Sequence, residues 1–210
     1  DPLRPFFLWT SFTKPHPPFD PCRDFWELYQ QISMPEPVYG DWSHSLEDTP
    51  QGFLAGSYEN TDMHLFGPEQ IAASRRAYYA CITQVDYQLG RLFGALREHG
   101  LFENTWILFT SDHGEMLGDH YMSQKNLFFE GSAHVPFILV PPAGRAIPHN
   151  NQVDGVITLA DVFPTILAMA GLTPPEDGSG ENLLPFLSGK GQKEKRFYGD
   201  SLHMNFCVME

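Results

Sequence analysis

Cysteine, basic residues and long apolar runs are all scarce in this sequence. Its 210 residues contain three cysteines, Cys22, Cys81 and Cys207, and no two of them have the spacing of metal ligands. Their odd number argues against a disulfide framework, and free thiols favour a cytoplasmic location over a periplasmic or secreted one. No stretch reaches the roughly 20 apolar residues that a membrane-spanning helix needs, so we expect no membrane span.

The shortage of basic residues restricts the possible partners. Lys and Arg total 13 against 26 Asp and Glu, so the net charge is −13. An acidic surface repels phosphate backbones, and we therefore expect no nucleic-acid partner. A small anionic substrate stays possible, because a metal ion and a few cations can reverse the sign of the charge inside one cleft. Nothing in the composition indicates an oligomeric state.

The first half of the chain contains a strand pattern, a proline-rich loop and a long helix pattern. Residues 5–12 are apolar and aromatic, which predicts a short buried strand. Four prolines follow within residues 15–21 and exclude a helix or a central strand there. We expect a short helix over 23–31 and a long loop over 33–67. Across 68–99 apolar residues recur mostly at steps of three and four, the pattern of a long amphipathic helix.

The second half alternates strand and helix patterns. Residues 105–110 are apolar throughout, which predicts a strand covered on both faces of its sheet. A further strand is expected over 135–140. Thr158 and Asp161 resemble a capping box that opens a helix ending near Ala170. This order of elements predicts an α/β fold, a layered α/β/α domain with a mostly parallel sheet.

A carboxylate and an imidazole stand side by side where the strand at 105–110 ends. In open α/β sheets the ligand crevice lies beyond the carboxyl ends of the strands, and Asp112 and His113 occupy that position. The carboxylate favours Ca²⁺ or Mg²⁺, and the imidazole adds Mn²⁺, Fe²⁺ and Zn²⁺ to the candidates. The same pattern also fits a capping aspartate followed by an ordinary polar histidine, because two ligands do not make a site.

Lys125 and His16 are the other two candidate site residues. Lys125 stands among apolar and aromatic neighbours and could point inward at an anion. His16, in the proline-rich loop, could donate a proton to a leaving group or bind an anion. Taken alone, each sequence context favours a solvated surface residue over a site residue. We interpret Glu115, Asp119 and His120 as ordinary polar residues without a role in the chemistry.

Four segments of the chain resemble the sulfatase family of the alkaline phosphatase superfamily, and they occur in family order. They are Thr110-Ser111-Asp112-His113-Gly114-Glu115 through His120 with Lys125 and Val135-Pro136, the strand and histidine loop at 7–19, the long helix at 78–100, and the helix and loop at 161–185. Many members carry Asn at the position of His113. The Asp-His version resembles the choline sulfatase and phosphonate monoester hydrolase branch, whereas His134 stands where the family often has Arg.

The resemblance implies a role for each candidate residue. Asp112 and His113 would bind one divalent metal ion, Ca²⁺, Mn²⁺ or Mg²⁺, together with acidic residues from an upstream strand. Lys125 and His16 would contact the sulfate of a small-molecule sulfate ester, and His16 would assist the departure of the alcohol. The implied fold is that of alkaline phosphatase, and the implied activity is sulfuric ester hydrolysis.

The nucleophile of the family does not occur in this sequence. It is a formylglycine made from Cys or Ser in a Cys/Ser-x-Pro-x-Arg motif, and no cysteine or serine here begins that motif. The family places the motif upstream of the segment resembling residues 6–19. We therefore expect a fragment that is inactive alone, with 1–195 as the carboxy-terminal part of the catalytic domain. Residues 196–210 would begin a truncated small C-terminal subdomain.

Two other functions are consistent with the same residues. A phosphonate monoester hydrolase or phosphodiesterase of the superfamily would use the Asp112-His113 pair equally well. A non-catalytic anion-binding module that kept the fold is the second alternative. The alcohol portion of the substrate is not readable from the sequence, although the loop at 33–67 is the candidate segment for specificity.

Overall fold

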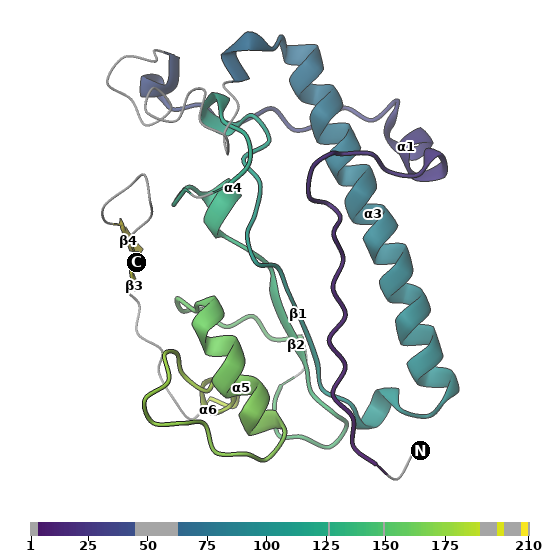
Figure 1. Ribbon diagram of the computed structural model, residues 1–210, viewed down its shortest axis with the longest axis vertical. Coiled ribbons are helices and arrows are strands. Elements are labelled where there is room, and N and C mark those ends of the chain that lie inside the picture. The colour runs from purple at the N-terminus through teal and green to yellow at the C-terminus, as the bar shows by residue number, and fades with distance from the viewer. Residues whose placement is uncertain are drawn as a thin grey trace. The chain divides into compact units, whose positions relative to one another are not determined.

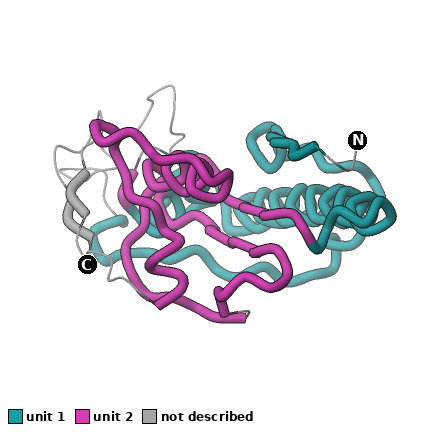
Figure 2. Tube along the Cα trace, turned by 90° about the horizontal axis from the view of Figure 1, so that it is seen from below, with its two compact units in different colours: residues 1–103, 114–125, 129–132 teal, residues 104–113, 126–128, 133–210 magenta. Residues whose placement is uncertain are grey.

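The computed structural model describes residues 4–44, 63–125, 127–148, 150–189, 197–199 and 207–209 (Figure 1). The chain folds into two compact units (Figure 2). Unit 1 comprises residues 1–103, 114–125 and 129–132, and unit 2 comprises residues 104–113, 126–128 and 133–210. No helix in the described residues is long and apolar enough to span a membrane. The predicted domain division at residue 195 stays a prediction.

Unit 1 is built on one long helix, α3 (Pro68–Glu98). Its first turn starts with a proline, whose missing N–H costs nothing there, and the Gln70 side chain accepts the Gly67 N–H at 2.8 Å. The helix stops where Gly100 takes a left-handed φ of 65°, the conformation that commonly ends helices. The helix expected over 68–99 is confirmed.

A short helix, α1 (Arg23–Tyr29), packs along α3 (Figure 1). The Tyr29 hydroxyl and Thr83 Oγ1 are 2.6 Å apart, and the Cys22 N–H donates to the Gln84 side chain at 2.8 Å. These contacts attach the end of the proline-rich loop to the middle of α3. The short helix expected over 23–31 is confirmed.

The buried hydrophobic residues of unit 1 come from the 3₁₀ turn at 63–65, from α3 and from the segment 114–125. They are Met63, Ile71, Ala80, Cys81, Met116 and Met122. Gly118 has φ 92°, and a Cβ at this position would lie 2.7 Å from Cγ2 of Ile71, so only glycine suits both its backbone and its space. Short 3₁₀ turns complete the unit: η1 (Asp41–His44), η2 (Met63–Leu65), η3 (Phe102–Asn104) and η4 (Asp119–Tyr121).

The buried strand expected over residues 5–12 is wrong for the described structure. These residues join no β-ladder within the described ranges. Phe7 and Trp9 are 69% and 72% exposed. A strand is stabilised by ladder hydrogen bonds and by side-chain packing against neighbours, and in the described part of the chain residues 5–11 join no ladder and are exposed. The long loop expected over 33–67 is described only at its two ends, because residues 45–62 lie outside the described residues.

Unit 2 contains two antiparallel strand pairs. β1 (Ile107–Thr110) pairs with β2 (Phe137–Val140), with Ile107 opposite Val140 and Thr110 opposite Phe137. β3 (Phe197–Gly199) pairs in the same sense with β4 (Cys207–Met209). The mostly parallel sheet that we expected is therefore wrong for the described strands. A parallel neighbour needs a crossover of a dozen or more residues, usually a helix. The chain between β1 and β2 is long enough, but in its described residues it contains η4 and, as its only α-helix, the four-residue α4 (Glu130–Ala133), which is too short to serve as a crossover helix.

The helix near residue 160 begins as the capping pattern predicts. Thr158 precedes η5 (Leu159–Asp161) and α5 (Val162–Met169), and the Thr158 N–H donates to Asp161 Oδ2 at 2.9 Å. The other Asp161 oxygen accepts the Glu181 N–H at 2.7 Å. This buried carboxylate therefore joins the start of the helix to the chain that leads to α6 (Leu184–Leu187).

Candidate active site

The structure brings together two predicted site residues of unit 1 that are 109 positions apart. Nζ of Lys125 lies 3.1 Å from Nε2 of His16. The half-buried Lys125 comes from the segment after η4, and the exposed His16 comes from the proline-rich loop. In that loop the backbone N–H of His16 donates to the Thr13 carbonyl oxygen at 3.0 Å. The structure therefore pairs the two residues expected to contact sulfate.

The hydrogen bonds of His16 decide which ring nitrogen carries a proton. Nδ1 lies 2.8 Å from the carbonyl oxygen of Pro17, and a carbonyl oxygen can only accept. Nδ1 is therefore the donor, and Nε2 of the neutral ring is the acceptor. Since the Lys125 ammonium has only protons to offer, it donates to Nε2. The result is a cation held against an imidazole whose orientation is set by the backbone.

The proline-rich loop is itself anchored by a lysine. Nζ of Lys14 donates to the carbonyl oxygen of Pro18 at 2.6 Å and forms an ion pair with the carboxylate of Asp20. The Lys14–Pro15 and Pro17–Pro18 peptide bonds are cis. These contacts close the loop around His16, so His16 is presented by a compact turn.

Lys125 is presented by a loop whose two ends are joined by backbone hydrogen bonds. The Gly114 N–H donates to the Ser132 carbonyl oxygen at 2.8 Å, and the Glu115 N–H donates to that of Gly131 at 2.6 Å. A Cβ on Gly114 would collide with the Gly131 carbonyl oxygen. The glycine after the Asp-His pair is thus required by close approach of two backbones.

Two polar residues without a predicted chemical role hold the chain before Asp41. Asp119 Oδ1 accepts the Val38 N–H at 3.0 Å, and the His120 N–H donates to the Val38 carbonyl oxygen at 2.7 Å. The Gly40 N–H donates to His120 Nδ1 at 3.1 Å. These hydrogen bonds give Asp119 and His120 a structural role, but the sequence held no signal for their partners, which lie some 80 positions away.

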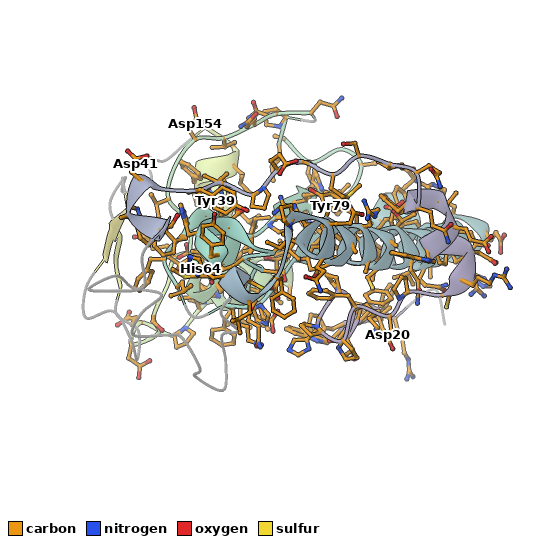
Figure 3. The ribbon with its side chains drawn as sticks, turned by 90° about the horizontal axis from the view of Figure 1, so that it is seen from above. Asp20, Tyr39, Asp41, His64, Tyr79 and Asp154 are labelled. Carbon is orange, nitrogen blue, oxygen red and sulfur yellow. The ribbon has the colours of Figure 1, made fainter. Side chains whose placement is uncertain are left out.

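Aromatic rings gather around these contacts. The His120 ring lies 5.0 Å from that of Trp42 and 4.8 Å from that of Phe129. Tyr121 stacks on both Tyr39 and His64, at 4.4 and 4.0 Å between centroids. Figure 3 labels Tyr39 and His64, the two partners of this stack. Burial lowers the pKa of His120, while nearby Asp119 acts in the opposite direction. The neutral ring thus suits its role as acceptor for Gly40.

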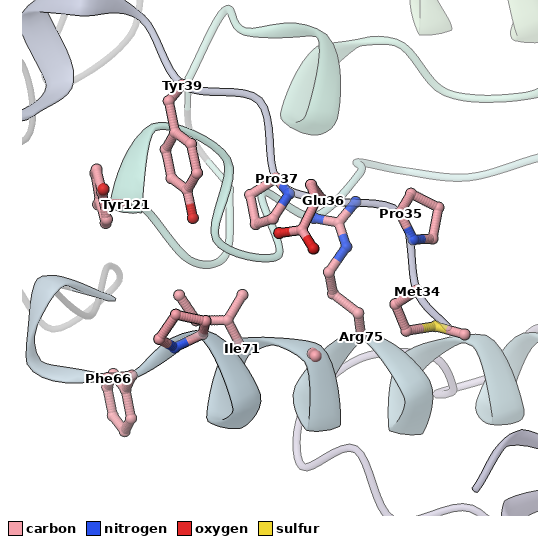
Figure 4. Close-up of a pocket in the computed structure, with 11 residues that line it drawn as sticks. Met34, Pro35, Glu36, Pro37, Tyr39, Phe66, Ile71, Arg75 and Tyr121 are labelled. Atoms are coloured by element: carbon pink, nitrogen blue, oxygen red, sulfur yellow. The ribbon is translucent and has the colours of Figure 1, made fainter. Parts of the chain in front are cut away.

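A separate cavity of about 280 Å³ lies beside the first turns of α3 (Figure 4). Its walls include Met34, Glu36, Phe66, Ile71, Arg75 and Tyr121. The buried Nε of Arg75 has no hydrogen-bond partner within the described residues. Neither His16 nor Lys125 lines this cavity, so it is distinct from the predicted sulfate contacts.

The predicted metal ligands lie in unit 2, directly after β1, as expected. His113 Nε2 and Asp112 Oδ2 are 3.9 Å apart, and the Asp112 side chain is 86% exposed. The Ser111 hydroxyl donates to the His113 carbonyl oxygen at 2.7 Å. Metal–ligand bonds of about 2.0–2.5 Å allow one cation to bind both atoms. The described ranges contain no group of three or more His, Cys, Asp or Glu side chains that could hold a metal ion, so this pair by itself supplies two ligands and not a complete shell.

The chain resembles known proteins over most of its length. Residues 1–172 match the family model described as Sulfatase. The chain is 37% identical over 184 residues to an arylsulfatase of Clostridium perfringens, covering 87% of this chain and 37% of that protein. It is 34% identical over 196 residues to a choline-sulfatase of Rhizobium meliloti, covering 91% of this chain and 37% of that protein.

Solved structures agree with these matches. The phosphonate monoester hydrolase of Agrobacterium radiobacter superposes with a TM-score of 0.74 at 32% identity, covering 88% of this chain and 39% of that one. The chain thus spans less than two fifths of the length of the relatives it matches.

Proposed function

Because this chain belongs to the sulfatase family of the alkaline phosphatase superfamily, we propose that it is the carboxy-terminal part of a sulfuric ester hydrolase. His16 and Lys125 would bind the sulfate, and Asp112 and His113 would bind a divalent metal ion. The observation that carries the proposal is the 3.1 Å contact between Nζ of Lys125 and Nε2 of His16. Two residues so far apart in sequence form a cationic pair that suits an anionic ester.

The pair supplies two elements of ester hydrolysis. The Lys125 ammonium stabilises negative charge on the sulfuryl oxygens as the ester bond breaks, usually the largest contribution in such transfers. The departing alkoxide needs a proton. Nε2 of His16 is the atom placed to hold it, because Nδ1 is bound to the carbonyl oxygen of Pro17. His16 would thus act as general acid at Nε2 once it has taken up a proton there and the Lys125 ammonium has turned from Nε2 to the sulfuryl oxygens.

The remaining chemistry would come from a metal ion and from a nucleophile outside residues 1–210. Asp112 and His113 fit part of the coordination shell of Ca²⁺, Mn²⁺ or Mg²⁺. Such an ion would supply Lewis acidity toward the sulfate oxygens. We propose a formylglycine in the longer protein, because no cysteine or serine here begins the required motif. Residues 1–210 alone would then show no turnover.

The test is an ester assay on the full-length protein with matched variants. We expect hydrolysis of an aryl sulfate, with kcat/KM lowered about 100-fold or more in Lys125→Ala. Mass spectrometry of the active protein should find formylglycine. His99→Gln, an exposed substitution after the end of α3, is the control and should keep full activity. No hydrolysis of any sulfate ester, or full activity in Lys125→Ala, would contradict the proposal.

One observation favours a second candidate, a phosphonate monoester hydrolase. The superposed structure with the TM-score of 0.74 is an enzyme of that name. The ratio of kcat/KM on aryl sulfate and aryl phosphonate esters separates the two activities. If kcat/KM on the sulfate ester divided by kcat/KM on the phosphonate ester is well above one, the first proposal is supported. If this ratio is well below one, the second proposal is supported.

A further inference from the structure

The carboxylate of Glu115 lies inside the loop that presents Lys125. Glu115 is 8% exposed, and it is one of the few charged residues buried in the described structure. Its Oε1 accepts the backbone N–H of Gln124, the residue immediately before Lys125. Burying a carboxylate is costly unless strong hydrogen bonds compensate. The hydrogen bond from the Gln124 N–H is one that offsets the cost of burying Glu115.

Gln124 is held on both sides of its backbone. Its N–H donates to Glu115 Oε1, and its carbonyl oxygen accepts the Met116 N–H at 2.8 Å. Gln124 has φ 64°, a left-handed conformation that is unfavourable for a residue with a side chain. The two hydrogen bonds therefore keep Gln124 in a conformation that it would not otherwise prefer.

This conformation sets the direction in which the chain enters Lys125. The side chain of Lys125 leaves the backbone one residue later and meets His16 at 3.1 Å. If Gln124 relaxed to a right-handed or extended conformation, the following Cα would move, and Nζ would lose its position beside Nε2. An N–H to carboxylate bond is charge-assisted and stronger than a neutral one, which suits it to hold a strained residue.

We infer that Glu115 is a positioning residue that places Lys125 against His16 through the backbone of Gln124. The inference rests on the proposed function, because it assigns Glu115 to the same sulfate site. Glu115 itself contributes no proton and no contact to the ester. Tyr78 is its neighbour on α3, and burial together with the Glu115 carboxylate raises the pKa of Tyr78 to about 12. Tyr78 therefore stays neutral beside the carboxylate.

The experiment compares substitutions of equal size that differ in hydrogen bonding. Glu115→Gln keeps an acceptor oxygen at the end of the side chain, and Glu115→Met fills the same space without one. Glu115→Asp withdraws the carboxylate by one methylene and serves if the methionine variant does not fold. Glu98→Gln, on the exposed surface of α3, is the control.

We expect Glu115→Met to lower kcat about 10- to 100-fold in the full-length enzyme, with KM changed less, as for other residues that orient a site. Glu115→Gln should recover most of the activity. In a protein that already carries Lys125→Ala, adding Glu115→Met should lower kcat by a further factor of less than about two, because the effects of residues that act through one another are not additive. The inference would be overturned if Glu115→Met lowered kcat by the same factor in the presence of Lys125 and in the Lys125→Ala variant. Full activity in folded Glu115→Met and Glu115→Asp would overturn it as well.

A second readout separates this inference from the proposed function. Acetic anhydride modifies exposed lysines, and mass spectrometry gives the rate at Lys125 relative to Lys14, whose own contacts lie in the proline-rich loop. Glu115→Met should raise this ratio severalfold by releasing Lys125. An unchanged ratio contradicts the positioning role even if the enzyme is active. A raised ratio in a protein that hydrolyses no sulfate ester refutes only the proposed function.

Discussion

Arg75 and Asp119 form an ion pair of 3.2 Å between Nη1 and Oδ1, with side chains only 10% and 21% exposed. The same Arg75 nitrogen donates to the Leu117 carbonyl oxygen at 2.9 Å, and Asp119 also accepts the Val38 N–H at 3.0 Å. This pair therefore joins α3, the loop that presents Lys125 and the chain before η1 within unit 1.

Removing the Asp119 carboxylate should destabilise the protein strongly. Asp119→Ala leaves the buried Arg75 without its counter-ion, and we expect a loss of about 3 kcal/mol in the free energy of unfolding. Urea denaturation monitored by circular dichroism measures the change. The control is Glu69→Gln, which breaks the Arg76–Glu69 pair at a glutamate that is 85% exposed. That variant should lose less than about 0.5 kcal/mol, and equal losses in the two variants would contradict the prediction.

The role of His16 as general acid predicts a dependence on the leaving group. A poor leaving group needs a proton in the transition state, whereas a nitrophenolate leaves without much assistance. His16→Ala should therefore lower kcat/KM about 100-fold or more on an alkyl sulfate and much less on nitrophenyl sulfate. Steady-state kinetics on both esters with the full-length enzyme measure the ratio. A uniform loss on the two substrates would instead assign His16 to binding alone.

His120 should make the protein less stable in mild acid. Burial lowers the pKa of His120 in the folded state, so the unfolded chain binds the proton more readily. The contribution of neutral His120 to the free energy of unfolding is fully present above the unfolded pKa of about 6.5. It is lost as the pH falls from there toward the lower pKa of the folded state. The melting temperature should drop between pH 7.5 and 5.5.

The His120→Asn variant tests this assignment. Asparagine tolerates the positive φ of 52° at this position and does not titrate. We expect a smaller drop in melting temperature between pH 7.5 and 5.5 than in the unsubstituted protein. An identical drop would show that other groups cause the acid sensitivity.

The cysteines should differ in reactivity. Cys81 is fully buried on α3, and burial raises the pKa of its thiol while Lys14 opposes the shift. Because the thiolate is the reactive species, Cys81 should resist iodoacetamide at pH 8 until denaturant is added. The exposed Cys22 should be labelled without denaturant. Peptide mapping by mass spectrometry follows each site, and rapid labelling of Cys81 in the folded protein would refute this prediction.

Local patterns predicted α1, α3 and α5 and the position of Asp112 and His113 directly after β1. The apolar spacing along α3, the capping residues Thr158 and Asp161, and the placement of Asp112 after an apolar strand all depend on neighbours within a few positions. Such features are encoded locally, because hydrogen bonding in a helix and alternation in a strand repeat every few residues. The proposed roles of His16 and Lys125 came from the family resemblance, because no spacing could supply them.

The sequence by itself determined the long helix, the two strands around the Asp-His pair and the family to which the chain belongs. The tertiary structure decided the rest: the antiparallel pairing of β1 with β2, the exposure of residues 5–11, and the contact of Lys125 with His16. It also gave Glu115 a partner at Gln124. These relationships depend on which distant segments meet, and the free energy of such contacts appears only once the chain has folded and excluded water from them.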